Sequence, residues 1–138
     1  MRRTLIAATA VAVVSCWVGM PRAAADNAVC TATWCSFLLP SHNVGCEMDY
    51  GRSGIPDETY CQTDSPPQSV RMTTSGSFKS CTGESCLGNA GEGTPTLEYG
   101  QTAVAGPFAC RSEPSGVTCT IPSGRGFTLS TAGVTAVG

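Results

Sequence analysis

The sequence predicts an all-β domain, a small disulfide-stapled β-sandwich or barrel, preceded by a helical signal peptide. Three observations lead to this fold class. Beyond residue 26, no stretch repeats apolar residues at helical spacing for three turns. Short alternating runs bounded by Gly, Pro, Asn and Ser recur instead, which is the pattern of all-β domains. Of the 9 cysteines, all but Cys16 lie in residues 26–138, and eight in those 113 residues is about 7%, close to the density of disulfide-bonded secreted domains.

The first 25 residues have the parts of a secretory signal peptide. A short basic start precedes an almost wholly apolar segment from Leu5 to Met20, and Ala23-Ala24-Ala25 fits the small-x-small cleavage rule. We expect cleavage after Ala25, so that residues 26–138 form one exported, disulfide-stapled all-β domain.

Cys16 supports a second interpretation of the same segment. Val13-Val14-Ser15-Cys16 resembles a bacterial lipobox, in which the cysteine is lipidated and becomes the mature N-terminus. The residues that follow, Trp17-Val18-Gly19-Met20, are apolar, whereas lipoproteins usually become polar there. We therefore expect a secreted protein, in the medium or the cell envelope, with membrane contact only if Cys16 is lipidated.

The charge of the mature chain excludes some partners. Loss of Arg2, Arg3 and Arg22 with the signal peptide leaves five basic residues against ten acidic ones, a net charge of −5. An acidic domain of this kind is repelled by phosphate backbones and by anionic lipid surfaces. We therefore expect no nucleic-acid partner.

The clearest structural unit is a hairpin between Phe108 and Ile121. Two alternating strands flank the turn Glu113-Pro114-Ser115-Gly116. Pairing Ser112 with Val117 gathers the apolar side chains on one face and places Cys110 opposite Cys119. Directly opposed residues have Cβ atoms about 4.5–5.5 Å apart, so we expect a Cys110–Cys119 disulfide.

Other alternating runs predict the remaining strands. They are Phe37–Leu39, Val44–Met48, Thr59–Thr63, Val70–Thr74, Phe78–Cys81, Leu97–Tyr99 and Phe127–Ser130. Ser75-Gly76 is expected to form a hairpin turn, and Leu87–Pro95, with three glycines, a surface loop. The segment PSHNVGC at 40–46 is similar to PSGVTC at 114–119, which we attribute to repeated Pro-Ser turn chemistry rather than duplication.

Five motifs follow one another in an order that resembles a known family. They are Phe37–Cys46 (FLLPSHNVGC), Phe78–Glu84 (FKSCTGE), Leu97–Gly100 (LEYG), Gly106–Cys119 and Ser123–Ser130 (SGRGFTLS). Together they resemble a small secreted cysteine-rich domain family of actinobacteria, which has no assigned function. The resemblance implies export and a small disulfide-bonded domain, and it implies no particular chemistry.

Two departures from that family bear on the other cysteines. Cys30 and Cys35 lie before the region that this chain shares with the family. Two cysteines that occur together outside the shared region are expected to form a disulfide with each other. The family usually has a cysteine soon after its Pro-Pro element, but none follows Pro66-Pro67 here, while Cys86 stands just after Cys81. Comparison with the family therefore implies a Cys81–Cys86 disulfide.

The pair that then remains is Cys46–Cys61. A competing pattern, Cys35–Cys46 with Cys30–Cys61, is also geometrically reasonable and stays open at this point.

Residues for catalysis or metal binding are scarce. His42 is the only histidine, and its place in a predicted turn indicates a solvated turn residue rather than a general base. No Gly-x-Ser-x-Gly motif is present, and exported cysteines are expected to form disulfides rather than a zinc site. We expect no catalytic residues, no cofactor and no metal.

Acidic and aromatic residues supply the other candidates. Five carboxylates cluster between residues 47 and 64, with Arg52 among them: Glu47, Asp49, Asp57, Glu58 and Asp64. Their spacing matches no calcium loop and does not single out the opposed pair that a glycosidase needs, so a solvated acidic face is favoured. Four aromatic residues are candidates for a glycan- or protein-binding surface, although core positions are favoured for most of them: Trp34, Tyr50, Tyr60 and Tyr99.

The sequence favours a non-enzymatic exported protein that binds a cell-wall glycan or an extracellular protein, or serves a structural role in the envelope. One alternative is a secreted hydrolase whose carboxylate pair the sequence does not locate. Another is a protease inhibitor that presents the Gly-rich loop at 88–96.

Overall fold

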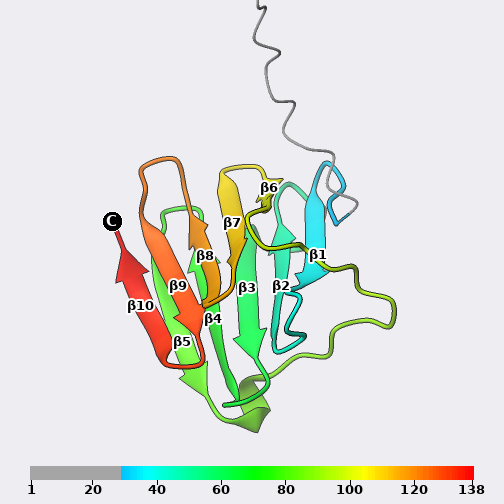
Figure 1. The fold of residues 1–138 in the computed structure, drawn as a ribbon. Coiled ribbons are helices and arrows are strands. Elements are labelled where there is room, and N and C mark those ends of the chain that lie inside the picture. The colour runs from blue at the N-terminus through cyan, green and yellow to red at the C-terminus, as the bar shows by residue number, and fades with distance from the viewer. Residues whose placement is uncertain (1–28) are drawn as a thin grey trace, which may run out of the picture.

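Two five-stranded antiparallel sheets packed face to face form the fold of residues 29–138, the part of the chain that the computed structural model describes (Figure 1). The first sheet consists of β1 (Trp34–Leu38), β2 (Val44–Asp49), β3 (Glu58–Thr63), β4 (Gln68–Thr73) and β5 (Phe78–Thr82). The second consists of β6 (Thr102–Ala105), β7 (Phe108–Glu113), β8 (Gly116–Thr120), β9 (Gly126–Ser130) and β10 (Gly133–Val137). The predicted all-β class is confirmed, and the architecture is a sandwich.

The expected signal peptide and Cys16 lie outside the described residues. Between residues 29 and 138, no helix is long and apolar enough to span a membrane.

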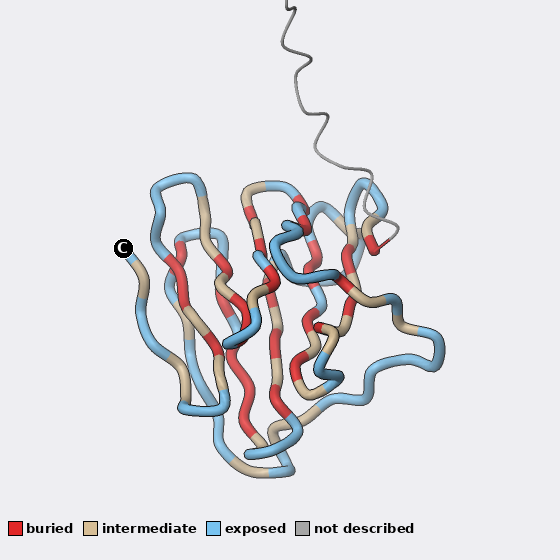
Figure 2. Tube along the Cα trace, viewed as in Figure 1, coloured by how far each residue is buried: buried red, intermediate tan, exposed pale blue. Residues whose placement is uncertain are grey.

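Period-2 alternation places the core between the sheets. In β3, for example, Thr59, Cys61 and Thr63 are buried, and the residues between them are only partly covered. Both inner faces contribute large side chains that are almost fully buried: Phe37, Met48, Met72, Phe108, Phe127 and Leu129. Figure 2 shows the buried residues gathered along the strands, whereas the turns between them are mostly exposed.

The hairpin of β7 and β8 has the predicted register. Ser112 pairs with Val117 and Cys110 with Cys119. The strands run one residue further than expected, because Glu113 also pairs with Gly116, and this leaves a two-residue turn.

One expected strand is not found, and two strands are found that were not expected. Residues 97–99 do not form a strand, and the pairing near them is one parallel bridge between Leu38 and Thr96. The side chain of Leu97 is buried in the core. The strands β6 and β10 were not expected, because their small side chains give only a weak apolar alternation. Pairing along their length with β7 and β9 makes them strands.

The two sheets repeat one plan. In each, the strands follow in sequence order, and a disulfide joins the third residue of the second strand to the fourth residue of the third strand. Since β1 and β5 lie on the same sides of the sandwich as β6 and β10 (Figure 1), an approximate two-fold rotation relates the sheets. The two Pro-Ser motifs lie in the β1–β2 and β7–β8 turns, which are not equivalent under this rotation. Their similarity therefore fits shared turn chemistry, as expected.

Residues 29–138 contain four disulfides. They join Cys30 to Cys35, Cys46 to Cys61, Cys81 to Cys86 and Cys110 to Cys119. These are the favoured pairs, and the competing pattern is not found.

The two central disulfides touch across the core. The Sγ atoms of Cys61 and Cys119, which are equivalent positions in the two sheets, lie 3.7 Å apart. Both sulfurs are already bonded within disulfides, so this is a van der Waals contact. The group that they form with Cys46 offers no free thiolate to a metal ion.

Candidate functional site

A segment that we call the roof segment, residues 84–96, crosses the outer face of the first sheet. It begins with the short 3-10 helix η1 (Glu84–Cys86), which follows β5. Tyr60 Oη donates a hydrogen bond to the carbonyl of Cys86 at 2.9 Å, and the amide of Gly88 donates to Gln62 Oε1 at 2.7 Å. Tyr60 and Gln62 flank buried Cys61 on β3, so both point outward and hold the roof segment on the sheet.

The far end of the roof segment is attached to β1. The amide of Leu38 donates to the Pro95 carbonyl at 2.9 Å, and the amide of Leu97 donates to the Leu38 carbonyl at 2.8 Å. Between these attachments, Thr94 donates to the Gly91 carbonyl through both its amide and its hydroxyl. The loop expected at 88–96 therefore folds back in a turn at 91–94, rather than presenting a fully extended backbone.

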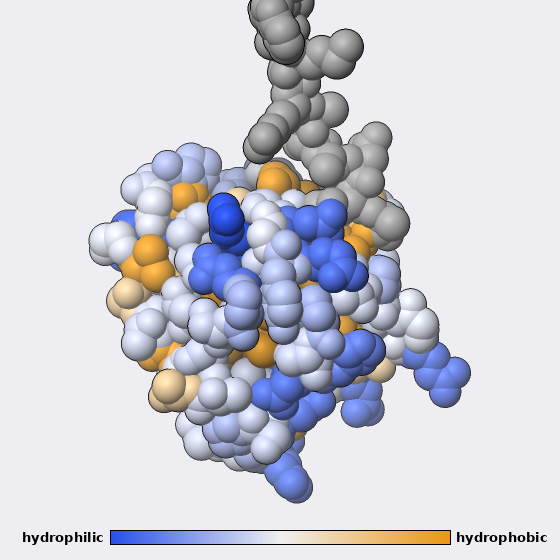
Figure 3. Space-filling model, viewed as in Figure 1, coloured by the Kyte–Doolittle hydropathy of each residue, from blue (hydrophilic) through white to orange (hydrophobic). Residues whose placement is uncertain are grey.

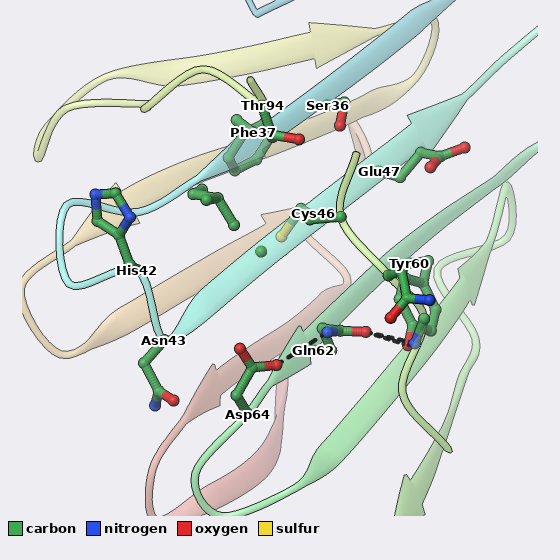
Figure 4. A pocket seen from close by; sticks show the side chains of 15 residues that line it. Ser36, Phe37, His42, Asn43, Cys46, Glu47, Tyr60, Gln62, Asp64 and Thr94 are labelled. Atoms are coloured by element: carbon green, nitrogen blue, oxygen red, sulfur yellow. Dashed lines mark hydrogen bonds between the residues drawn. The ribbon is translucent and has the colours of Figure 1, made fainter. Parts of the chain in front are cut away.

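A pocket of about 110 Å³ lies beneath the roof segment (Figure 4). Its floor includes Leu38 and Gly45, and the end of the Leu38 side chain lies over Gly45. A Cβ at this position would come within 3.0 Å of Leu38 Cδ2. Polar side chains surround this apolar floor: Ser36, His42, Asn43, Glu47, Tyr60, Gln62, Asp64, Asn89 and Thr94.

Gly45 and Gln62 were not among the residues singled out from the sequence. A glycine inside an otherwise alternating strand does indicate a place of close approach, and that signal was available at Gly45. The role of Gln62 had no local signal, because the amide that it binds lies 26 residues further along the chain.

His42 does not form a catalytic group with the other residues of the pocket. It is exposed in the β1–β2 turn, where its φ of 60° is the left-handed conformation of a turn residue. In Figure 4 it lies at the opposite end of the pocket from Ser36 and Glu47. Within residues 29–138 its imidazole has no hydrogen bond to a carboxylate.

Three of the five clustered carboxylates meet in a second cleft on the same face. Glu47, Asp49 and Glu58 line a cleft of about 320 Å³ together with Tyr60 and Arg71. The other two carboxylates lie apart from it: Asp57 accepts a bond from the Gly51 amide at 2.8 Å, and Asp64 accepts one from Gln62 at 3.1 Å.

Arginines balance the charge of this cleft. Arg52 Nη1 is 2.5 Å from Asp49 Oδ1 and 3.9 Å from Glu47 Oε1, and its guanidinium lies 5.7 Å from the centroid of the Trp34 ring. Arg71 pairs with Glu58 and lies 4.7 Å from the ring centroid of Tyr60. Two guanidinium groups therefore face three carboxylates in this cleft, and Glu47 has the weakest ion pair of the three.

The four candidate aromatic residues do not form one surface. Trp34 and Tyr60 lie on the outer face of the first sheet. Tyr50 packs edge-on against Phe108, with ring centroids 6.5 Å apart, and Tyr99 is exposed in the turn before β6. Only Tyr60 lines the pocket.

Burial raises the pKa of the Glu47 carboxyl above its ordinary value of 4.5, and the negative charge of Asp49 raises it further, against the opposing effects of Trp34 and Arg52. A carboxyl whose pKa is higher in the folded state stabilises the fold most below its unfolded pKa. That contribution is lost as the pH rises through the folded value.

We therefore expect Glu47→Gln to raise the free energy of unfolding at pH 7 and to lose this advantage near pH 4. The gain should stay below about 1 kcal/mol, because the Glu47 side chain is half exposed and solvent screens its charge. Thermal unfolding of both proteins between pH 3 and pH 7 measures the difference. An equal difference at every pH would contradict the assignment.

No family model, curated protein or solved structure matches the chain. The resemblance to the actinobacterial family therefore stays a prediction, and the function is argued from the geometry of the site.

Proposed function

We propose that this protein is an exported, non-enzymatic binding module of the cell envelope or the medium, and that its ligand is a glycan. One sugar residue would occupy the pocket beneath the roof segment. The observation that carries the proposal is the pocket beneath the roof segment, in which Leu38 and Gly45 form an apolar floor under a ring of hydroxyl, amide and carboxylate groups. Apolar concave sites with a few converging polar groups are typical of small-ligand binding.

A glycan fits this site better than a protein partner does. Specific protein interfaces bury about 800 Å² on each partner, whereas this pocket is small and lies under a chain segment. The opposite face of the molecule, over the second sheet, offers no broad apolar patch either, because apolar residues are scattered on it (Figure 3). The disulfides support a site of action in an oxidising compartment outside the cytosol.

Adding bulk to the floor of the pocket tests the proposal. The variant Gly45→Val should fold, because the nearest atom to the new Cβ is the flexible end of Leu38. We expect it to lose about tenfold or more in affinity for glycans that the wild type binds, since the methyl groups occupy the ligand's space. A glycan array that includes oligomers of N-acetylglucosamine identifies the ligand, and calorimetry compares the variants.

Ala109→Val is the matched control, because Ala109 is the equivalent second residue of β7 on the outer face of the other sheet. It adds similar bulk away from the pocket and should bind like the wild type. A wild-type protein that binds no glycan on the array, or that binds as well with Gly45→Val, overturns the proposal. If the protein binds an extracellular protein and no glycan, its ligand is a protein.

A second candidate function is hydrolysis, and it rests on the meeting of Glu47, Asp49 and Glu58 in one cleft. The raised pKa of Glu47 suits a general acid, and an ionised neighbouring carboxylate suits its partner. If bound glycan is cleaved, and Glu47→Gln binds it without cleaving it, the protein is a hydrolase and not a binding module.

A further inference from the structure

One disulfide differs from the other three in its exposure. Cys81 is exposed and Cys86 is half-buried. Each of the other disulfides has at least one buried sulfur-bearing residue, and five cysteines are 0–5% exposed: Cys35, Cys46, Cys61, Cys110 and Cys119. Thiol–disulfide exchange requires that an attacking thiolate reach a sulfur atom, so exposure decides which disulfide reacts first.

This exposed disulfide lies at the start of the roof segment. It ties Cys86, the last residue of η1, to Cys81 in β5. The strand β5 is an edge of the first sheet and pairs only with β4, so few other contacts hold the end of β5 and the η1 helix that follows it.

Few other contacts hold the beginning of the roof segment in place. The amide of Gly83 donates to the Pro67 carbonyl at 2.9 Å, and Tyr60 and Gln62 bind Cys86 and Gly88 as described above. All of these bonds lie at the surface or are only partly buried, where water competes for each donor and acceptor.

We propose that Cys81–Cys86 is a thiol–disulfide exchange site whose reduction by an external dithiol frees the start of the roof segment and opens the pocket. A thiolate of the dithiol attacks the sulfur of Cys81, forms a mixed disulfide and releases Cys86 as a thiolate, which takes up a proton. The second thiol of the reductant resolves the mixed disulfide. Two electrons and two protons pass to the protein, and the dithiol leaves as a disulfide.

The chemistry of this site stands independently of the proposed glycan. Only the last consequence, loss of ligand from the opened pocket, rests on the proposed function.

Differential alkylation tests the exchange. The folded protein is incubated with limiting dithiothreitol, alkylated with iodoacetamide and mapped by mass spectrometry. We expect Cys81 and Cys86 to be labelled at least about tenfold faster than Cys30 and Cys35, because the two disulfides span the same five-residue separation and differ in burial. Equal rates, or earlier labelling of Cys30 and Cys35, overturn the exchange site.

Hydrogen exchange tests the opening. In the double variant Cys81→Ser, Cys86→Ser, amides at 84–90 should exchange about tenfold faster than in the oxidised wild type, with β7 and β8 unchanged. Tyr60→Phe, which removes the hydroxyl bonded to Cys86, should show the same change to a smaller degree. Unchanged exchange at 84–90 in both variants overturns the opening.

Glycan binding separates the two proposals. If the array ligand binds the oxidised protein and is lost on reduction, both proposals hold. Selective labelling and faster exchange without any glycan binding support the redox site and contradict the proposed function. A reduced protein that keeps full affinity for the glycan overturns the control of the pocket by this disulfide.

Discussion

Changing both Cys110 and Cys119 to alanine is expected to lower the free energy of unfolding by about 3–5 kcal/mol. Two effects combine in this loss. The disulfide restricts the unfolded chain, and its sulfurs also fill the centre of the core, where Cys119 contacts Cys61 of the opposite sheet at 3.7 Å. Alanine leaves that space empty, and the surrounding β-strands relax only in part. Denaturation in guanidinium chloride measures the change.

The matched comparison is the double variant Cys81→Ser, Cys86→Ser. It removes a disulfide that closes a shorter loop at the exposed edge of the first sheet. We expect a loss of about 2 kcal/mol, because the shorter loop restricts the unfolded chain less and no core contact is lost. If the two double variants were equally stable, the contact between the central disulfides would contribute nothing to the core.

Gly126→Ala is expected to destabilise the protein by about 3 kcal/mol. Its backbone lies so close to β8 that a Cβ would stand 1.9 Å from the carbonyl oxygen of Cys119 and 2.8 Å from Thr120 Cα. These are backbone atoms of the neighbouring strand, so no side chain can rotate away. The strands β8 and β9 must separate, at the cost of their hydrogen bonds and of the packing of Phe127.

Gly91→Ala is the control for this steric effect. Position 91 is exposed in the roof segment, and a Cβ added there would meet no atom within 4 Å. We expect its free energy of unfolding to stay within about 0.5 kcal/mol of the wild-type value. Urea denaturation of the two variants under the same conditions gives the comparison. A wild-type midpoint for Gly126→Ala would contradict the close approach of the strands.

The register of the β7–β8 hairpin could be predicted from the sequence, whereas the grouping of carboxylates in the acidic cleft could not. The register of β7 and β8 was predictable, because two alternating runs flank a short turn and only one register gathers Phe108, Cys110 and Cys119 on one face. The position of Glu58 beside the carboxylates of β2 was not predictable. Residues 50–57 connect β2 to β3, and a connection of this length does not set the register of the two strands as a two-residue turn does.

The pocket was harder to predict than the acidic cleft. Its floor depends on Gly45, and its roof depends on bonds from Tyr60 and Gln62 to residues that lie 26 positions further along the chain. No local sequence pattern predicts a contact between residues so far apart in the chain. Sequence reasoning placed Tyr60 among four candidate aromatic residues, and only the fold distinguishes it from Tyr50 and Tyr99.

Local sequence patterns account for the all-β class, the register of the β7–β8 hairpin and the excess of acidic residues in residues 26–138. These properties follow from composition and from an alternation of period two, both of which act between neighbours along the chain or across one short turn. Long-range packing determines that two meanders form a sandwich, that their disulfides meet at Cys61 and Cys119, and that residues 84–96 cover one outer face. Those outcomes depend on contacts between segments far apart in the chain, whose energies arise only when the sheets have formed and packed together.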